Sequence, residues 1–269
     1  MGIGKVSSLA AASLAKVNSL AKASINKINS VTASFSTFAD NISFDFDGAN
    51  DYLTRDTIGS LETKGSVSAW VKLDSMSANG FIFQLKAESG TNDQIILLWN
   101  NAAGVIRGNV KFGGTTNIVD SGSGLENDGN WHHVAFTWES GSKTSANNIT
   151  RIYIDGSQTD SDAIGNTWAD ASAPSELVIG RNSIQSNAYF NGHINDVAIF
   201  DDALTGNEVT AIYNSGSPKD ESSHSGLVAY YTMEAYVDED TTLADDSGNS
   251  NTISIQNSSD IDSTDTPSG

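Results

Sequence analysis

The strongest strand signal in this chain is the stretch Gly129-Asn130-Trp131-His132-His133-Val134-Ala135-Phe136-Thr137-Trp138. Successive side chains of a strand point to opposite faces, so the odd-numbered and even-numbered residues of the stretch face different ways. Both sets include bulky groups, which predicts a central strand that is covered on both sides. Its predicted partner is Arg151-Ile152-Tyr153-Ile154-Asp155-Gly156, whose Asp-Gly pair is a strong hairpin-turn signal.

Many shorter strands are predicted around this pair. From about residue 40, apolar side chains recur at every second position, and the runs are separated by turns rich in Gly, Asn, Asp and Ser. This pattern predicts an all-β sandwich or jelly roll rather than an α/β fold. The predicted strands are residues 42–46, 52–54, 66–73, 81–85, 94–99, 105–112, 115–119, 177–180, 192–200, 227–233 and 253–255.

One short helix is predicted between these strands. Thr205 is placed as its N-cap, and Glu208 stands three residues later, where it completes a capping box. Leu204 and Val209 have the spacing of a hydrophobic staple. The helix is expected to end near Tyr213, before a turn-rich segment.

The composition excludes several classes of protein. The chain has no cysteine, so it contains neither a disulfide nor a thiolate metal site. Its 14 basic and 33 acidic residues give a net charge of −19, which argues against nucleic-acid binding. No apolar run is long enough to predict a membrane-spanning helix.

The first 40 residues differ from the rest, because residues 1–39 hold four lysines and no acid. Residues 3–31 repeat every 11 residues, and the apolar side chains of the repeat would share one face of a helix that needs a partner. We predict an arm at residues 1–40 that anchors or oligomerises the protein. Because Ser and Asn are poor helix formers, an extended arm and a solvated tail are the alternatives. The expected anchoring residues are Val6, Leu9, Leu14, Val17, Leu20, Ile25, Ile28 and Val31.

The order of motifs resembles the concanavalin A-like jelly roll of the laminin G-like family. The matching segments run from Phe46-Asp47-Gly48 through Asn130–Ala135 to Ala203-Leu204-Thr205, so the resemblance covers about residues 42–215. It implies one jelly roll at residues 41–256, followed by a C-terminal tail at residues 257–269. The block from Gly226 onward usually opens such a domain but comes last here. Residues 227–256 are therefore expected to complete the sandwich in permuted order, the alternative being the stump of a second copy.

The arrangement of arm, domain and trailing block resembles virion proteins of marine tailed phages. It implies a non-enzymatic capsid-decoration, tail or fibre protein whose arm binds other virion proteins, as a homo-oligomer in the virion. The N-terminus is only weakly signal-like, because Ser7, Ser8 and Ser13 dilute its apolar run, so we expect it to be retained. The alternative is a bacterial secreted or cell-surface carbohydrate-binding module.

Catalytic signatures are missing from the sequence. Related glucanases carry an alternating acidic motif on one strand, because two carboxylates must flank the scissile bond, and no such spacing occurs here. Neither a nucleophile elbow nor a phosphate-binding Gly loop with Lys is present. His132 and His133 point to opposite faces, so packing or hydrogen bonding is expected of them rather than metal binding. We predict that the protein is not an enzyme.

Calcium is the one cofactor that the sequence favours, since Ca²⁺ takes six to eight oxygen ligands. The acidic loop 245–251 offers Asp246, Asn249 and Asn251, and the family resemblance implies that Asp196 can lie near it. Asp47, Asn50 and Asp51 form a second oxygen-rich turn. The alternative is that these residues only build turns.

A glycan is the other candidate ligand, because sugar faces stack on exposed aromatic rings. Trp168 stands in a polar loop without a strand pattern, and Tyr189 lies close to Asn187. These three residues are the predicted glycan site, although Trp168 could equally pack against the sandwich. Trp70, Trp131 and Trp138 are expected in the core.

Overall fold

The computed structural model describes residue 38 and residues 40–87, 93–112, 115–126, 128–140, 148–163, 173–184, 188–237, 240–257 and 261–267. The chain divides into two compact units, Met1–Thr37 and Phe38–Gly269. The predicted anchoring residues of the arm belong to the first unit and lie outside the described residues. Everything below concerns the second unit.

Two antiparallel sheets build the second unit. The strands of the first sheet are β1 (Ser43–Asp47), β3 (Lys64–Leu73), β8 (His132–Glu139), β9 (Ile149–Ile154), β10 (Ser157–Asp162), β12 (Asn191–Phe200), β13 (Leu227–Tyr231) and β16 (Asp262–Ser263). Their order is β10-β9-β8-β3-β12-β1-β16, and β13 pairs with β12 beside this path.

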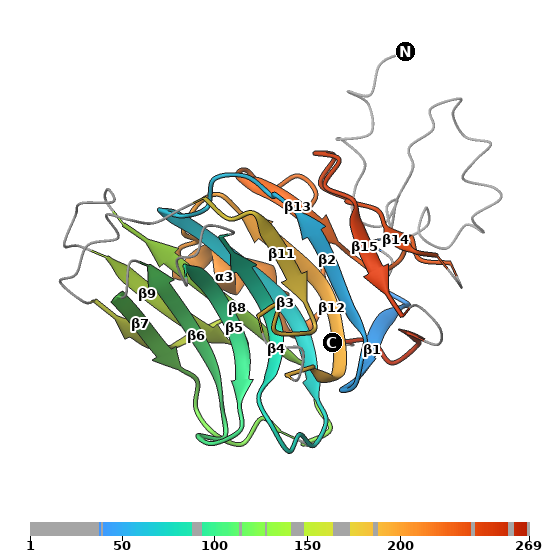
Figure 1. The fold of residues 1–269 in the computed structure, drawn as a ribbon, viewed down its shortest axis with the longest axis horizontal. Coiled ribbons are helices and arrows are strands. Elements are labelled where there is room, and N and C mark those ends of the chain that lie inside the picture. Colours follow the sequence, from blue (N-terminus) through green and yellow to red (C-terminus); the bar gives the residue numbers. More distant parts are fainter. Residues whose placement is uncertain are drawn as a thin grey trace, which may run out of the picture. The chain divides into compact units, whose positions relative to one another are not determined.

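The second sheet packs face to face against the first (Figure 1). Its strands are β2 (Tyr52–Asp56), β4 (Gly80–Lys86), β5 (Gln94–Asn100), β6 (Val105–Phe112), β7 (Thr115–Asp120), β11 (Glu176–Ile179), β14 (Thr242–Leu243) and β15 (Ile253–Gln256). Their order is β14-β15-β2-β11-β4-β5-β6-β7. The predicted all-β jelly-roll sandwich is confirmed.

The strand β8 lies between β3 and β9, as its sequence predicts, and it is covered on both faces. Val134, Phe136 and Trp138 are fully buried between the sheets. On the outer face, Ala135 packs with the helix α3 (Gly206–Tyr213), which lies behind the strands in Figure 1. The alternating side chains of residues 129–138 thus contribute to two cores, the sandwich core on one face and a smaller core under the helix on the other.

The helix α3 begins where the capping box predicts. The Thr205 side chain accepts a hydrogen bond from the Glu208 backbone N–H, and the Glu208 carboxylate accepts one from Thr205 N at 2.7 Å. The reciprocal bonds satisfy two of the N–H groups that a helix start leaves unpaired. Asn214 closes the other end in the left-handed conformation, and the 3-10 turn η2 (Asn214–Gly216) follows.

The last strands join both sheets. β13 pairs with β12, β15 pairs with β2, and β16 pairs with β1. Residues 257–269 are predicted as a tail, yet this segment contributes β16 and the fully buried Ile261. The physical reason is that β1 would otherwise leave one row of backbone hydrogen-bonding groups unpaired at the sheet edge. Two residues are too short for an alternating pattern to predict such a strand.

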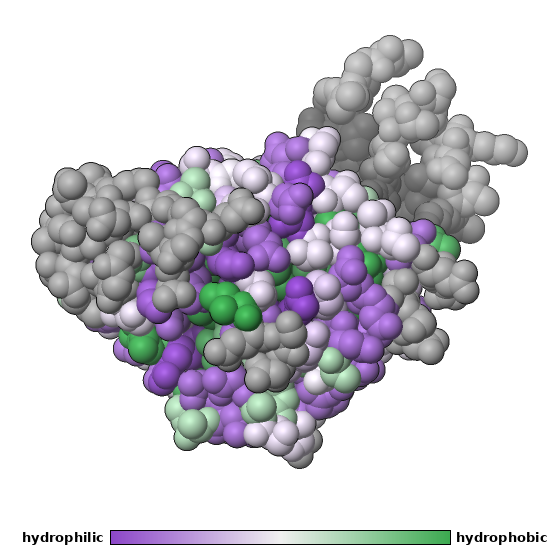
Figure 2. Space-filling model, in the orientation of Figure 1, coloured by the Kyte–Doolittle hydropathy of each residue, from purple (hydrophilic) through white to green (hydrophobic). Residues whose placement is uncertain are grey.

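The face of the second unit that is turned to the viewer in Figure 1 is mostly hydrophilic, with small hydrophobic patches (Figure 2). The outward-facing residues Phe81, Ile96, Leu98 and Ala188 form a separate apolar cluster. Among the described residues, no helix is long and apolar enough to cross a membrane.

Candidate functional site

A hollow of about 440 Å³ lies on the outer face of the first sheet, where α3 ends. We call it the Trp131 hollow. Its aromatic walls are Trp70 of β3, Trp131 just before β8, and Tyr213 at the end of α3. Its polar walls are Lys72, Asn130, Asp155 and Asp265.

Asp265, in the last described segment of the chain, holds the Trp131 ring in place. The Trp131 Nε1–H donates a hydrogen bond to Asp265 Oδ1 at 2.9 Å, and Lys72 Nζ lies 2.6 Å from Asp265 Oδ2. Burial opposes ionisation of Asp265, but the hydrogen bonds from Lys72 and Trp131 outweigh it and lower the carboxyl pKa. The Asp265 carboxylate is therefore charged and fixes the ring as one wall of the hollow.

Asp155, at the hairpin turn between β9 and β10, also lines the hollow. One carboxylate oxygen accepts a hydrogen bond from the His133 backbone N–H at 2.9 Å, and the other lies 2.9 Å from His132 Nδ1. The second ring nitrogen of His132 lies 3.0 Å from Asp128 Oδ2. The hydrogen bond to Asp155 raises the pKa of His132; burial opposes it, and Asp128 adds to it. The protonated ring can donate to both carboxylates, which joins the two loops beside the hollow.

His133 lies on the other face of β8 and has a different state. It is fully buried, and burial lowers its pKa to about 4, so the ring is neutral at physiological pH. Its Nε2 lies 2.7 Å from Ser68 Oγ, and the ring packs edge-on against Trp70 at 5.4 Å between centroids. His133 therefore supports the floor of the Trp131 hollow through packing.

Trp131 is the residue of this hollow that the sequence places wrongly. Trp70 and Trp138 are buried as expected, whereas Trp131 is only half-buried and lines the hollow. The alternating pattern of the sequence includes Trp131 in the strand, whereas β8 starts one residue later, at His132. The turn before β8 turns the ring toward the C-terminal segment.

The structure gives a partial account of the predicted glycan residues. Trp168 and Asn187 lie outside the described residues, so their roles stay predictions. Tyr189 is half-buried and forms an isolated bridge with Arg181, whose guanidinium lies 3.5 Å from the centroid of the Tyr52 ring. Tyr189 thus sits beside a cation–π pair rather than on a free surface loop.

The predicted calcium residues already have protein partners. Asp246 accepts a hydrogen bond from Thr232 Oγ1 at 2.7 Å, and the amides of Asn249 and Asn251 donate to Val228 O at 3.1 and 2.7 Å. Asp196 is buried and accepts the Tyr230 hydroxyl at 3.0 Å. These contacts tie the loop to the segment around β13, and they engage the amide nitrogens of Asn249 and Asn251 rather than the amide oxygens.

In the described part of the chain, no three His, Cys, Asp or Glu side chains are arranged to hold a metal ion. The second oxygen-rich turn is likewise organised by its own backbone, because Asp47 Oδ1 accepts the Ala49 and Asn50 N–H groups. Calcium binding at Asp196, Asp246, Asn249 and Asn251 stays a prediction.

Two antiparallel sheets, packed face to face with one short capped helix outside, define a concanavalin A-like jelly roll. The chain belongs to the concanavalin A-like lectin/glucanases superfamily, since the laminin G-like model of that superfamily matches residues 47–210. The family resemblance of the sequence is thereby confirmed.

Individual relatives agree with the fold. A proposed carbohydrate-binding protein from Bacteroides ovatus is 21% identical, with a TM-score of 0.59 over 85% of this chain and 61% of its own. The SAP-like pentraxin of Limulus polyphemus is 19% identical, with a TM-score of 0.51 over 65% of this chain and 82% of its own. A rat protein with sushi, von Willebrand factor type A, EGF and pentraxin domains is 26% identical over 65% of this chain, which spans only 5% of that protein.

Proposed function

We propose that this protein is a non-enzymatic carbohydrate-binding protein and that its ligand occupies the Trp131 hollow. The observation that carries the proposal is the pairing of half-buried Trp131 and Tyr213 with polar groups around one hollow. Sugar rings stack their C–H faces on aromatic rings, while their hydroxyls bond to amides, ammonium groups and carboxylates. Asn130, Lys72 and Asp155 supply those groups here.

Two structural relatives support the choice of ligand class. The Bacteroides ovatus protein is described as a proposed carbohydrate-binding protein. Domain 4 of the Geobacillus stearothermophilus arabinanase AbnA was solved in complex with arabinotriose; it is 21% identical, with a TM-score of 0.50 over 64% of this chain and 76% of its own. At these identities the likeness concerns the fold, so the ligand is argued from the hollow itself.

The carboxylates of the hollow favour binding over hydrolysis. A glycosidase needs one carboxyl group with a raised pKa to act as general acid. The pKa of Asp265 is instead lowered, with Lys72 and Trp131 as partners, and Asp155 is engaged by His132 and the His133 backbone. Asp265 is therefore not poised to protonate a leaving oxygen.

Replacing Trp131 by Ala is expected to abolish most glycan binding. Loss of the stacking surface should weaken affinity about tenfold or more, measured on a glycan array and then by calorimetry with the best glycan. Trp131→Phe should retain part of the affinity because it keeps a ring. Trp168→Ala is the matched variant for the other predicted site and should bind as the unmodified protein does. Binding that survives Trp131→Ala, or an array without any signal, would refute the proposal.

We further propose that the protein is a component of a phage virion and that its N-terminal arm anchors it there. The 11-residue repeat of residues 3–31 and the separation of a basic arm from an acidic domain favour this role over a free secreted module. Deleting residues 1–37 should prevent incorporation into particles, measured by mass spectrometry of purified virions, and leave glycan binding intact. Equal incorporation of the shortened chain would contradict the anchoring role.

A further inference from the structure

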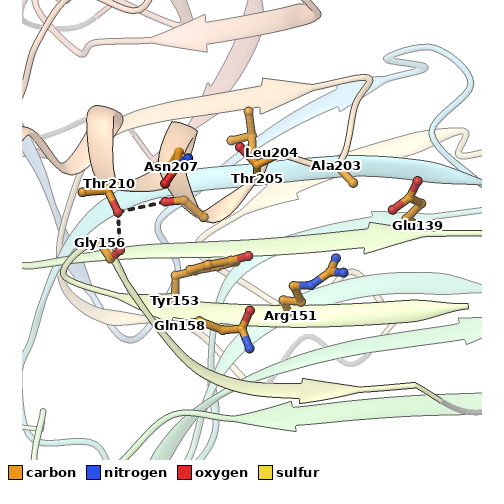
Figure 3. Close-up of a pocket in the computed structure, with 11 residues that line it drawn as sticks. Glu139, Arg151, Tyr153, Gly156, Gln158, Ala203, Leu204, Thr205, Asn207 and Thr210 are labelled. Atoms are coloured by element: carbon orange, nitrogen blue, oxygen red, sulfur yellow. Dashed lines mark hydrogen bonds between the residues drawn. The ribbon is translucent and has the colours of Figure 1, made fainter.

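A second hollow, which we call the Arg151 hollow, lies on the same sheet face at the start of α3 (Figure 3). Its volume is about 480 Å³, and it shares no lining residue with the Trp131 hollow. Figure 3 shows Arg151, Tyr153 and Gln158 of the β9–β10 hairpin across from the helix start at Thr205 and Asn207. The two hollows lie at opposite ends of the helix, since Asn207 at its start lines the Arg151 hollow and Tyr213 at its end lines the Trp131 hollow.

Arg151 is one of the described cations that have no carboxylate partner in this acidic protein. Five other described basic side chains lie within 4.0 Å of a carboxylate, namely Lys64, Lys72, Lys86, Arg107 and Lys219. In the part of the chain that the structure describes, Arg151 has no such partner, although Glu139 lines the same hollow. Its strand neighbours in register are Thr137 and Ser161, which carry no charge. The guanidinium is therefore available to an anion from solution.

The other polar groups around Arg151 are also available. The side-chain amides of Gln158 and Asn207 form no hydrogen bond with another described group, and neither does the hydroxyl of the largely buried Tyr153, which in Figure 3 points toward Arg151. By contrast, the Thr210 hydroxyl on the helix side is used inside the protein, where it donates to Gly156 O at 2.9 Å. The hollow thus offers one cation, two free amides and a phenol.

We propose that the Arg151 hollow binds a sugar acid, with the carboxylate on Arg151 and the hydroxyls on Gln158, Asn207 and Glu139. The planar guanidinium matches a carboxylate with two parallel hydrogen bonds. Amides donate and accept, which suits a ring with several hydroxyls. A doubly charged phosphate is disfavoured, because Glu139 lines the same hollow and the domain as a whole is acidic.

The test uses the full-length protein and three matched probes in isothermal titration calorimetry: methyl β-D-glucuronide, its methyl ester, and methyl glucoside 6-phosphate. The acid should bind about tenfold or more tightly than the neutral ester, because the ester loses the charge-assisted pair. Equal binding of acid and ester, tighter binding of the phosphate, or no binding of the acid would each overturn the assignment.

Variants locate the site. Arg151→Gln should weaken binding of the acid about tenfold, and Arg151→Lys should restore only part of it, because an ammonium lacks the planar fork. Arg107→Gln, which removes an arginine already paired with Asp120 at 2.7 Å, should change nothing. Gln158→Ala and Asn207→Ala each remove an amide that the proposal places on the sugar hydroxyls, so each should weaken binding of the acid. Both positions are exposed, so folding is not at risk. Trp131→Ala should leave this binding unchanged, so failure here and failure of the glycan site are distinguishable. Unchanged binding of the acid by Arg151→Gln, or loss of binding with Arg107→Gln, would refute the location.

Discussion

Deleting residues 227–269 is expected to leave a chain that does not fold cooperatively. This segment supplies β13, β14, β15 and β16, which pair with strands at several places in both sheets. Its described residues also include nine buried apolar side chains, which are Ala229, Tyr230, Tyr231, Met233, Tyr236, Leu243, Ile253, Ile255 and Ile261. Burial of one large apolar side chain contributes about 1.5–3 kcal/mol, whereas a whole domain is stable by only about 5–15 kcal/mol.

The measurement is a comparison of residues 1–226 with the full chain by near-UV circular dichroism, amide NMR dispersion and urea unfolding. The shortened chain should lack fixed tertiary signals. Deletion of residues 1–37 is the matched control, because that segment is a separate unit, and it should leave the unfolding transition of the domain in place. A cooperative transition at nearly the same urea concentration as in the full chain after loss of residues 227–269 would show instead that these strands are an accessory.

Local signals were sufficient to predict much of this fold. Thr205 and Glu208, three residues apart, predict the start of the helix, and the structure contains their reciprocal hydrogen bonds. The Asp155-Gly156 pair sets the β9–β10 turn, where both residues have positive φ as a tight hairpin requires. Alternation places Val134 and Ala135 in two different cores. Each of these features depends on neighbours in the sequence.

The candidate sites were not predictable in the same way. Trp131 becomes a surface wall only because Asp265, 134 residues later, accepts its indole N–H. Arg151 and Asn207 come from a strand and a helix start, and only the placement of α3 on the sheet brings them to one hollow. Asp246 and Asn251 have the composition of a calcium loop, but their partners Thr232 and Val228 are set by tertiary pairing. Sequence spacing carries no information about such distant contacts.

Replacing Gly192 by Ala is the point substitution with the largest expected effect. Gly192 is the second residue of the central strand β12. It lies between Phe46 of β1 and Leu73 of β3, and its φ is +129°. A Cβ there would lie 2.3 Å from Lys72 O and 2.9 Å from Asp74 N. Both are backbone atoms, which cannot rotate away, so β3 would have to move. Strain from the positive φ costs about 1–3 kcal/mol and the overpacking about 1–3 kcal/mol more.

Gly59→Ala separates these two costs. Gly59 also has a positive φ, +106°, but a Cβ there meets nothing within 4 Å. Gly59→Ala should therefore lose only the backbone contribution of about 1–3 kcal/mol, whereas Gly192→Ala should lose about 2–6 kcal/mol in urea unfolding. Because the displaced backbone belongs to Lys72, which is bound to Asp265 at the Trp131 hollow, Gly192→Ala should also weaken glycan binding. Equal losses of stability for the two variants would mean that β3 adapts to the added methyl group, and the close approach of β3 and β12 would then not constrain the hollow.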